Sequence, residues 1–321
     1  MENIPIVSVV LPNYNHSLYL KERIESILNQ TFDQFELIIL DDCSTDNSRE
    51  ILLSYKNHPK VSAIVLNDKN TGNTFLQWDK GIQLAQGKYI WIAESDDAAD
   101  NRFLEKTVTA IEAQPEAVIC LSGSILIDEN SRPKKTASRD RWKETGEVKV
   151  FDGTEYVKHN LLYRNYVYNA SMVIFRRDIY ARLDKSFQRL RCAGDWQFWT
   201  EVALQGKVIE IRLKLNRFRQ HSNKVSSRAK YTGEGVSDMI EVMKYGLSHV
   251  SVSRYRKMLI QGECYRKIRH CKASKEIKKE LYHKGHKILD TGYTQYFLGR
   301  INRIASYIIP FLSTHRRDKL K

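Results

Sequence analysis

The chain has 321 residues, of which 42% are hydrophobic and 28% charged, a balance that suits a folded globular protein and excludes a disordered or fibrous one. The formal net charge of +14 is unevenly distributed. Residues 1–221 carry 30 basic and 30 acidic side chains, whereas residues 222–321 carry 22 and 8. The composition therefore predicts a neutral domain over residues 1–221 and a separate basic region over residues 222–321.

The sequence disfavours secretion and membrane insertion. The five cysteines show no C-x-x-C or zinc-finger spacing, which is typical of reduced thiols in the cytosol. Residues 1–5 lack the basic region of a signal peptide. The longest late apolar stretch, residues 305–312, is too short to span a bilayer and contains Pro310. We therefore expect a cytoplasmic protein without a transmembrane segment.

The first hundred residues alternate between short apolar runs and segments of helical periodicity. Strands are predicted over residues 6–11, 36–40, 61–66 and 88–93, and helices between them. These β–α repeats favour an α/β fold with a right-handed, doubly wound, mostly parallel sheet flanked by helices.

The rest of the sequence predicts a less regular half and a helical tail. The expected elements are helices over residues 101–113 and 195–205 and strands over 117–127, 169–175, 207–211 and 215–220. The polar segment 128–147 is interpreted as a binding loop. Helical periodicity then continues as a C-terminal basic helical region. The expected domains are residues 1–221 and 222–321.

Two acidic turns follow predicted strands. Asp41-Asp42 comes after the strand over 36–40, and Glu94-Ser95-Asp96-Asp97 comes after the strand over 88–93. In open α/β sheets, ligands bind beyond the carboxyl ends of the strands. Carboxylates gathered there would repel one another without a neutralising cation. The pattern therefore favours binding of a metal–diphosphate complex.

Six motifs occur in a fixed order along the chain. They are V-V-L-P-N-Y-N at 9–15, D-D-C-S-T-D at 41–46, N-T-G-N at 70–73, A-Q-G-K-Y-I at 85–90, E-S-D-D at 94–97 and G-D-W-Q-F-W at 194–199. This order and spacing closely resemble the family 2 glycosyltransferases, inverting enzymes of the GT-A fold that use nucleotide-diphospho-sugars. The resemblance covers roughly residues 6–221 and implies a Rossmann-like GT-A sheet.

The resemblance also implies a donor site. Pro12 and Tyr14 would line the nucleotide, and Asp42 would accept a hydrogen bond from the N3–H of a uracil base. Asp41 is interpreted instead as a residue that holds the turn through backbone bonds. Asp96 would contact the sugar or the ribose.

Metal ligands are implied by the same resemblance. Asp97 occupies the position of the family's D-x-D motif and would ligate Mn²⁺ or Mg²⁺. His221 lies in an arginine–histidine–serine stretch that often follows the catalytic domain. It would complete the metal shell, or it would contact the diphosphate together with Arg219. A simple polar turn is the alternative for residues 94–97, but it does not explain Asp42 at the same edge.

Asp195 is the predicted catalytic base, because an inverting transferase needs one group to take the proton from the acceptor hydroxyl. It heads a predicted helix, which stabilises the ionised form and makes an N-cap the structural alternative. The family often has Glu-Asp here, whereas this chain has Gly194-Asp195. One carboxylate of the family pattern is therefore missing.

The basic tail has three interpretations: an anionic membrane surface, a nucleic acid, or a solvated helical face. Near its end, Phe297, Ile301 and Ile304 alternate with Arg300 and Arg303, a pattern that suits an in-plane helix at a membrane surface. We therefore favour membrane contact over nucleic-acid binding.

Together these features predict a metal-dependent inverting glycosyltransferase, cytoplasmic and peripheral on the inner face of the membrane. It would move a sugar from a UDP-sugar to a saccharide or lipid-linked acceptor in surface polysaccharide biosynthesis. Two alternatives are a nucleotide-sugar-binding protein with weak or lost activity, and a nucleic-acid-binding protein that acts through the tail.

Overall fold

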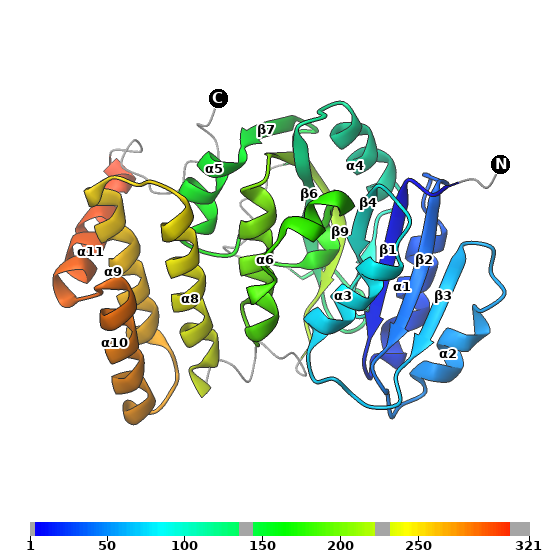
Figure 1. Ribbon diagram of the computed structural model, residues 1–321, viewed down its shortest axis with the longest axis horizontal. Helices are drawn as coiled ribbons and strands as arrows, with labels where there is room; N and C mark the ends of the chain where they lie inside the picture. The colour runs from blue at the N-terminus through cyan, green and yellow to red at the C-terminus, as the bar shows by residue number, and fades with distance from the viewer. Residues whose placement is uncertain (1–3, 135–143, 222–231, 309–321) are drawn as a thin grey trace. The chain divides into compact units, whose positions relative to one another are not determined.

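The computed structural model of the protein describes residues 4–134, 144–221 and 232–308 (Figure 1). The chain divides into two compact units that are interleaved in sequence. The first comprises Met1–Val150, Asn169–Asp184 and Gln205–His221, and the second comprises Phe151–Tyr168, Lys185–Leu204 and Ser222–Lys321. The first unit ends at residue 221, and two segments from within residues 1–221 belong with the C-terminal helices.

The first unit opens with the alternation of strands and helices that the sequence predicts. Its elements are β1 (Val7–Asn13), α1 (Ser17–Leu28), β2 (Phe35–Asp41), α2 (Ser48–Ser54), β3 (Val61–Leu66), α3 (Thr74–Leu84) and β4 (Tyr89–Ile92). The strands β3, β2, β1 and β4 are parallel neighbours in that order (Figure 1). Their carboxyl ends therefore meet at one edge of the sheet, where the two acidic turns begin.

The second half of the sheet is mixed. Its strands are β5 (Ala98–Ala99), β6 (Ala117–Ile127), β7 (Val148–Asp152), β8 (Val173–Arg176) and β9 (Lys207–Arg219). Helix α4 (Phe103–Glu112) follows β5 in the chain. Strand β8 lies between β4 and β6 and is antiparallel to both, whereas β6 and β9 are parallel. The two strands predicted over 207–211 and 215–220 are one continuous strand, β9, whose pairing with β6 only shifts register. Of the predicted loop 128–147, residues 135–143 lie outside the described residues.

Helices cover both faces of the parallel strands. On one face, Val9, Leu37 and Trp91 lie in a core formed with α1, α2 and α4. On the other face α3 packs close to β1 and β2, where Gly81 faces Val10 and Leu40. Because both faces are covered, these strands are continuous apolar runs in the sequence.

The second unit is helical. Its main elements are α5 (Gly153–Tyr156), a π-helical segment (Val157–Leu161), α6 (Gly194–Ala203), α8 (Glu234–His249), α9 (Arg254–His270), α10 (Lys275–Leu289) and α11 (Tyr293–Ile308). Figure 1 shows α8, α9, α10 and α11, coloured yellow to red, side by side. Among the helices of the described residues, none combines the length and apolar character needed to cross a bilayer.

Specific contacts bind the two internal segments to these helices. The Arg256 guanidinium donates to His159 Nδ1 at 2.9 Å, and the Cys192 backbone N–H donates to the Asp238 carboxylate at 2.7 Å. Charge composition could not predict this arrangement, because these contacts join segments that are distant in sequence.

Gly87 precedes β4 at a close approach of two backbone segments. A Cβ atom at this position would lie 2.6 Å from the Ser8 backbone nitrogen and 2.7 Å from the Val7 carbonyl carbon. Backbone atoms inside a sheet cannot move aside cheaply. We expect Gly87→Ala to lower the free energy of unfolding by about 2 kcal/mol, measured by denaturant titration.

Gly299 in α11 provides the matched control, because a Cβ atom there meets nothing within 4 Å. Gly299→Ala should leave stability unchanged or raise it by about 0.5–1 kcal/mol, since alanine favours a helix. Equal losses in the two variants would contradict the proposed close approach at Gly87.

Candidate active site

Asp41 is the last residue of β2, and its carboxylate is fully buried among hydrogen-bond donors of the protein. Its carboxylate accepts hydrogen bonds from the Ser44 backbone N–H at 2.9 Å, the Ser44 hydroxyl at 2.5 Å and the Asn13 amide at 2.9 Å. Arg49 Nε lies 3.0 Å from the same carboxylate. These contacts confirm that Asp41 holds the turn that carries Asp42.

Asp42 is 5% exposed and is oriented by donors from the end of β3, the loop after it and α3. Its carboxylate accepts from Asn67 Nδ2 at 2.8 Å, Thr71 Oγ1 at 2.8 Å and Gln77 Nε2 at 3.0 Å. The Thr71 backbone N–H adds a further bond at 3.0 Å. A carboxylate has about four acceptor positions, so these partners account for the acceptor capacity of Asp42.

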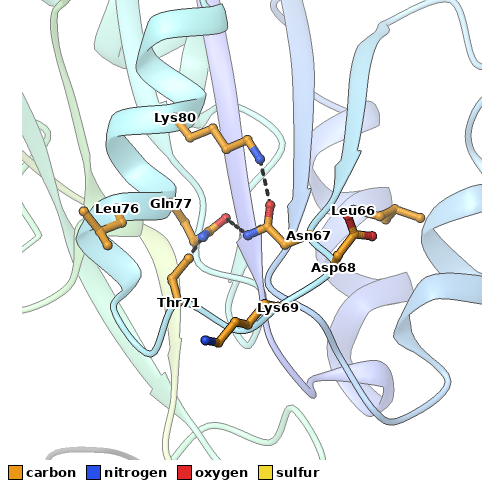
Figure 2. A pocket seen from close by; sticks show the side chains of 8 residues that line it. All are labelled: Leu66, Asn67, Asp68, Lys69, Thr71, Leu76, Gln77 and Lys80. Atoms are coloured by element: carbon orange, nitrogen blue, oxygen red, sulfur yellow. Dashed lines mark hydrogen bonds between the residues drawn. The ribbon is translucent and has the colours of Figure 1, made fainter.

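A hollow of about 340 Å³ lies beside these partners of Asp42 (Figure 2). It is lined by Leu66, Asn67, Asp68, Lys69, Thr71, Leu76, Gln77 and Lys80. Figure 2 shows Gln77 and Lys80 of α3 reaching toward Asn67, and Lys80 Nζ donates to Asn67 Oδ1 at 2.7 Å. Asn67, Gln77 and Lys80 therefore form a connected polar network in the wall of this hollow, and Lys69 is a second lysine of the lining.

Asp97, in the second acidic turn, is fully buried. One of its oxygens accepts from Asn169 Nδ2 at 2.7 Å and Ser171 Oγ at 2.8 Å, and the other accepts from the Arg219 backbone N–H at 3.0 Å. Burial and the charge of Asp96 together raise the pKa of Asp97 to about 6, against the opposing effects of Arg23 and of the hydrogen bonds from Asn169 and Arg219. Both oxygens of Asp97 thus fasten the turn to other parts of the chain, and its role as a metal ligand stays a prediction.

A different trio has the arrangement of metal ligands. His16, Asp96 and His221 each offer one ligand atom, and these atoms all lie within 4.8 Å of one another. His221 Nε2 is 2.9 Å from Asp96 Oδ2, and His16 Nδ1 is 2.8 Å from the Ser95 hydroxyl oxygen. The cluster thus contains His221, which the sequence suggests as a metal ligand, and Asp96, which the sequence suggests as a sugar or ribose contact. His16 escapes prediction because it precedes α1 without a motif, although it follows the turn after β1.

Arg219 is fully buried next to this cluster and acts as a cross-link. Its guanidinium donates to the carbonyl oxygens of Asp96 at 2.7 Å and Asp128 at 3.0 Å, and to the Glu22 carboxylate at 2.6 Å. It also lies over the ring of Tyr19, 4.6 Å from the ring centroid. The guanidinium of Arg219 is already used in these hydrogen bonds within the protein, which does not fit the predicted contact with a diphosphate.

Arg23 is a second buried arginine that the sequence does not single out. It is fully buried in α1, with its guanidinium carbon 4.8 Å from the centroid of the Trp91 ring. Within the described residues, its three side-chain nitrogens have no hydrogen-bond partner. Burial lowers the pKa of Arg23 to about 10, against the opposing effect of Asp97, Glu94 and Asp96. The arginine thus supplies a positive charge to the second acidic turn.

Glu94 reduces the charge of the same turn in another way. Burial, together with the charges of Asp96 and Asp97, raises its pKa to about 8. Trp78 Nε1 donates to its carboxylate at 3.0 Å. At neutral pH Glu94 is mostly protonated, so the turn carries less negative charge than its sequence suggests.

Asp195 belongs to the second unit, where it is the second residue of α6. The N-cap of this helix is Ala193, so the structural alternative of an Asp195 cap does not apply. Asn165 Nδ2 donates to the Asp195 carboxylate at 2.8 Å. Burial raises the pKa of Asp195 to about 6, although its hydrogen bonds lower it. A carboxylate with this pKa is ionised at neutral pH and close enough to neutrality to accept a proton.

The residues predicted to line the nucleotide lie at the end of β1. Pro12 is buried within the strand, where it pairs with Leu40, and Tyr14 is 46% exposed just beyond it. Strand β1 lies between β2 and β4, so this turn lies between the two acidic turns. This strand order, the two acidic turns at one edge and the histidine–carboxylate cluster are the arrangement expected from the resemblance to the GT-A glycosyltransferase class.

Comparison with known sequences agrees with this class. Residues 8–183 match glycosyl transferase family 2, and the chain belongs to this family. An uncharacterized glycosyltransferase of Haemophilus influenzae is 31% identical over 234 residues, which cover 71% of this chain and 69% of that protein. The chain spans a smaller share of other relatives, such as 40% of TuaG of Bacillus subtilis, which is named for teichuronic acid biosynthesis and is 37% identical over 102 residues.

Solved structures share the fold. The structure of S. aureus TarS 1–349 in complex with UDP-GlcNAc has a TM-score of 0.63 at 18% identity, over 95% of this chain and 92% of that one. The mannosyltransferase PcManGT of Pyrobaculum calidifontis, solved with GDP-Man and Mn²⁺, has a TM-score of 0.53 at 15% identity, over 98% of this chain and 88% of that one. At these identities the likeness concerns the fold alone.

The two neighbouring aspartates of the second turn should respond differently to the same substitution. Asp97→Asn replaces one carboxylate oxygen by an amide N–H₂, which would face the donors that now bond to Asp97. The substitution also leaves the buried Arg23 beside a neutral group. We expect it to lower the free energy of unfolding by about 3 kcal/mol, measured by denaturant titration.

Asp96→Asn is the matched control, because Asp96 is partly exposed and its carboxylate lies 2.9 Å from His221 Nε2. Its stability loss should be about 1 kcal/mol. If Asp96→Asn were the more destabilising of the two, the division of roles between these residues would be wrong.

Proposed function

We propose that the protein is an inverting glycosyltransferase that moves a sugar from a nucleotide-diphospho-sugar, with UDP favoured, to a saccharide or lipid-linked acceptor in surface polysaccharide biosynthesis. The observation that carries the proposal is the cluster of His16, Asp96 and His221, placed next to the acidic turn after β4. A diphosphate held there would lie at the carboxyl edge of the parallel strands, where α/β folds bind their ligands.

Asp42 and the hollow beside it are the proposed site of the nucleobase. A carboxylate accepts the ring N–H that uracil carries at N3 and guanine at N1, whereas cytosine and adenine carry only an exocyclic amino donor on that edge. Thr71 donates to Asp42 through both its backbone N–H and its hydroxyl. We infer that the base replaces the Thr71 hydroxyl, because that hydroxyl donates to Oδ2, whereas Asn67 and Gln77 both donate to Oδ1. TarS, the neighbour solved with UDP-GlcNAc, supports a uracil base.

The cluster fits a divalent transition metal. It offers two imidazole nitrogens and one carboxylate oxygen, a mixed set that suits Mn²⁺ better than Mg²⁺, which prefers oxygen ligands alone. A bound ion would supply charge stabilisation to the leaving diphosphate. The bond from His16 Nδ1 to Ser95 would leave Nε2 for the metal and fix the orientation of the ring. Asp97, Arg219 and their partners would hold the turn that presents Asp96.

Asp195 is the proposed base. It would accept the proton of the acceptor hydroxyl as that oxygen attacks the anomeric carbon. The Asn165 amide donates to Asp195 Oδ2 at 2.8 Å and so orients the carboxylate. The alternative function is that of a protein that binds a nucleotide-sugar without transferring it. Such a protein would bind the donor normally after loss of Asp195.

The predicted cytoplasmic location and peripheral membrane association are part of the same proposal. A lipid-linked acceptor resides in a membrane, so an enzyme that uses one gains from staying at that surface. Nucleic-acid binding through the basic tail is the weaker candidate, since the site described above needs no nucleic acid.

Donor binding should stabilise the protein only when the metal is present. We expect UDP with Mn²⁺ to raise the melting temperature by several degrees at saturating ligand, and EDTA to abolish the shift. His16→Ala and His221→Ala should lose the Mn²⁺-dependent part of the shift, measured by thermal denaturation with a panel of nucleoside diphosphates. His58→Ala, a partly exposed histidine at the opposite end of β3, is the control and should keep the full shift. If both His16→Ala and His221→Ala kept the full rise in melting temperature, the assignment of the metal site would be wrong.

The rate should depend on the ionisation of Asp195. Because burial raises its pKa to about 6, the ionised form, and with it kcat/KM, should rise tenfold per pH unit below pH 6 and level off above it. Asp195→Asn should lower kcat by about 10³-fold and leave donor binding unchanged. Initial rates of sugar transfer between pH 5 and 8, compared with the donor-induced thermal shift, test both statements. A plateau that extends unchanged to pH 5 would contradict the assignment.

A further inference from the structure

Helix α11 carries a row of large apolar side chains on its surface. Tyr293, Phe297, Ile301 and Ile304, here called the α11 stripe, are 61%, 54%, 49% and 64% exposed. Their spacing of four, four and three residues places them on one face of the helix. Exposed apolar residues are common singly, but a row of four on one helix calls for a partner.

The opposite face of α11 is already occupied. Tyr296 and Asn302 are buried, and the Tyr255 hydroxyl of α9 donates to Asn302 Oδ1 at 2.8 Å. Gly262 lies so close to the backbone of Gln295 that a Cβ atom there would sit 2.1 Å from its carbonyl oxygen. The helix is therefore held firmly against α9, and the stripe faces away from this contact.

Positive charge accompanies the stripe. Arg300 and Arg303 are both exposed on α11, and the spacing places Arg300 on the same face as Phe297 and Ile304. The surrounding region, residues 222–321, has 22 basic and 8 acidic side chains. A partner surface that is apolar beneath and negatively charged above would match both properties.

We propose that the α11 stripe docks onto an anionic lipid bilayer, with the helix lying in the plane of the membrane. The apolar side chains enter the boundary of the acyl chains, and Arg300 stays at the level of the lipid phosphates. This surface deepens the proposed membrane association and does not depend on transferase activity.

A second copy of the chain fits the stripe less well. Four side chains on one helix offer much less than the roughly 800 Å² per partner of a stable interface. A two-fold contact through the stripe would also bring two strongly basic regions together. Oligomeric state is therefore one outcome of the test.

The test is sedimentation of the full chain with vesicles of phosphatidylcholine alone, or with about one third phosphatidylglycerol. We expect binding only to the anionic vesicles. Phe297→Ser/Ile301→Ser should lower the partition coefficient at least about tenfold. Arg300→Glu should lower it roughly twentyfold, since each charge near the surface changes binding about fivefold.

Matched controls lie in the first unit. Leu53→Ser changes an apolar side chain of α2 that is 44% exposed, and Lys56→Glu reverses an exposed charge. Both should bind vesicles as the unmodified chain does. Because all these positions are exposed, circular dichroism and the UDP-induced thermal shift should be unchanged in every variant.

Three results would overturn the proposal. The first is no binding of the unmodified chain to anionic vesicles. The second is binding that the Phe297→Ser/Ile301→Ser variant retains in full, which would assign it to another basic segment. The third is a dimer, detected by size-exclusion chromatography with light scattering, that this variant loses.

Discussion

Burying a carboxylate as completely as Asp97 costs several kcal/mol unless donors and opposite charge surround it. The chain meets this requirement with Asn169 and Ser171, the backbone N–H of Arg219, and the positive charge of Arg23. These partners come from α1, from the residues that lead into β8 and from the end of β9. The single carboxylate therefore ties the end of β4 to elements from both halves of the first unit, and the geometry of the acidic turn depends on it.

Asp96 and Asp97 differ in their partners, although they are adjacent in the sequence. With Asp97 fixed among its partners, Asp96 is directed to the side where His221 lies, at 2.9 Å. Glu94, mostly protonated, and Arg23 limit the negative charge of the turn, so it is stable before any cation arrives. The sequence suggests that the two acidic turns repel each other, but each turn has its own neutralising groups. In the first turn, Arg49 pairs with Asp41.

Much of the fold could be predicted because its signals are local. The strands β1 to β4 are continuous apolar runs, and the helices between them have clear periodicity, so their order follows from the chain alone. The site could be predicted only to the level of the turns that carry it. Which of Asp96 and Asp97 faces outward depends on donors more than 70 residues away, and His16 carries no motif. The same holds for the segment Phe151–Tyr168, whose place among the C-terminal helices rests on contacts such as that of Arg256 with His159.

The position of His221 and Arg219 at the end of β9 has a consequence for how the protein is made. Asp96 and His221 are separated by 125 residues, and Asp97 and the Arg219 backbone N–H by 122. At a synthesis rate of about 5–20 residues per second, the β4 turn leaves the ribosome roughly 6–25 seconds before these partners. During that interval the nascent chain holds a half-assembled sheet whose buried acid lacks part of its support. Completion of the first unit is therefore a late event of translation, and the cluster of His16, Asp96 and His221 closes only when nearly seven tenths of the chain has emerged.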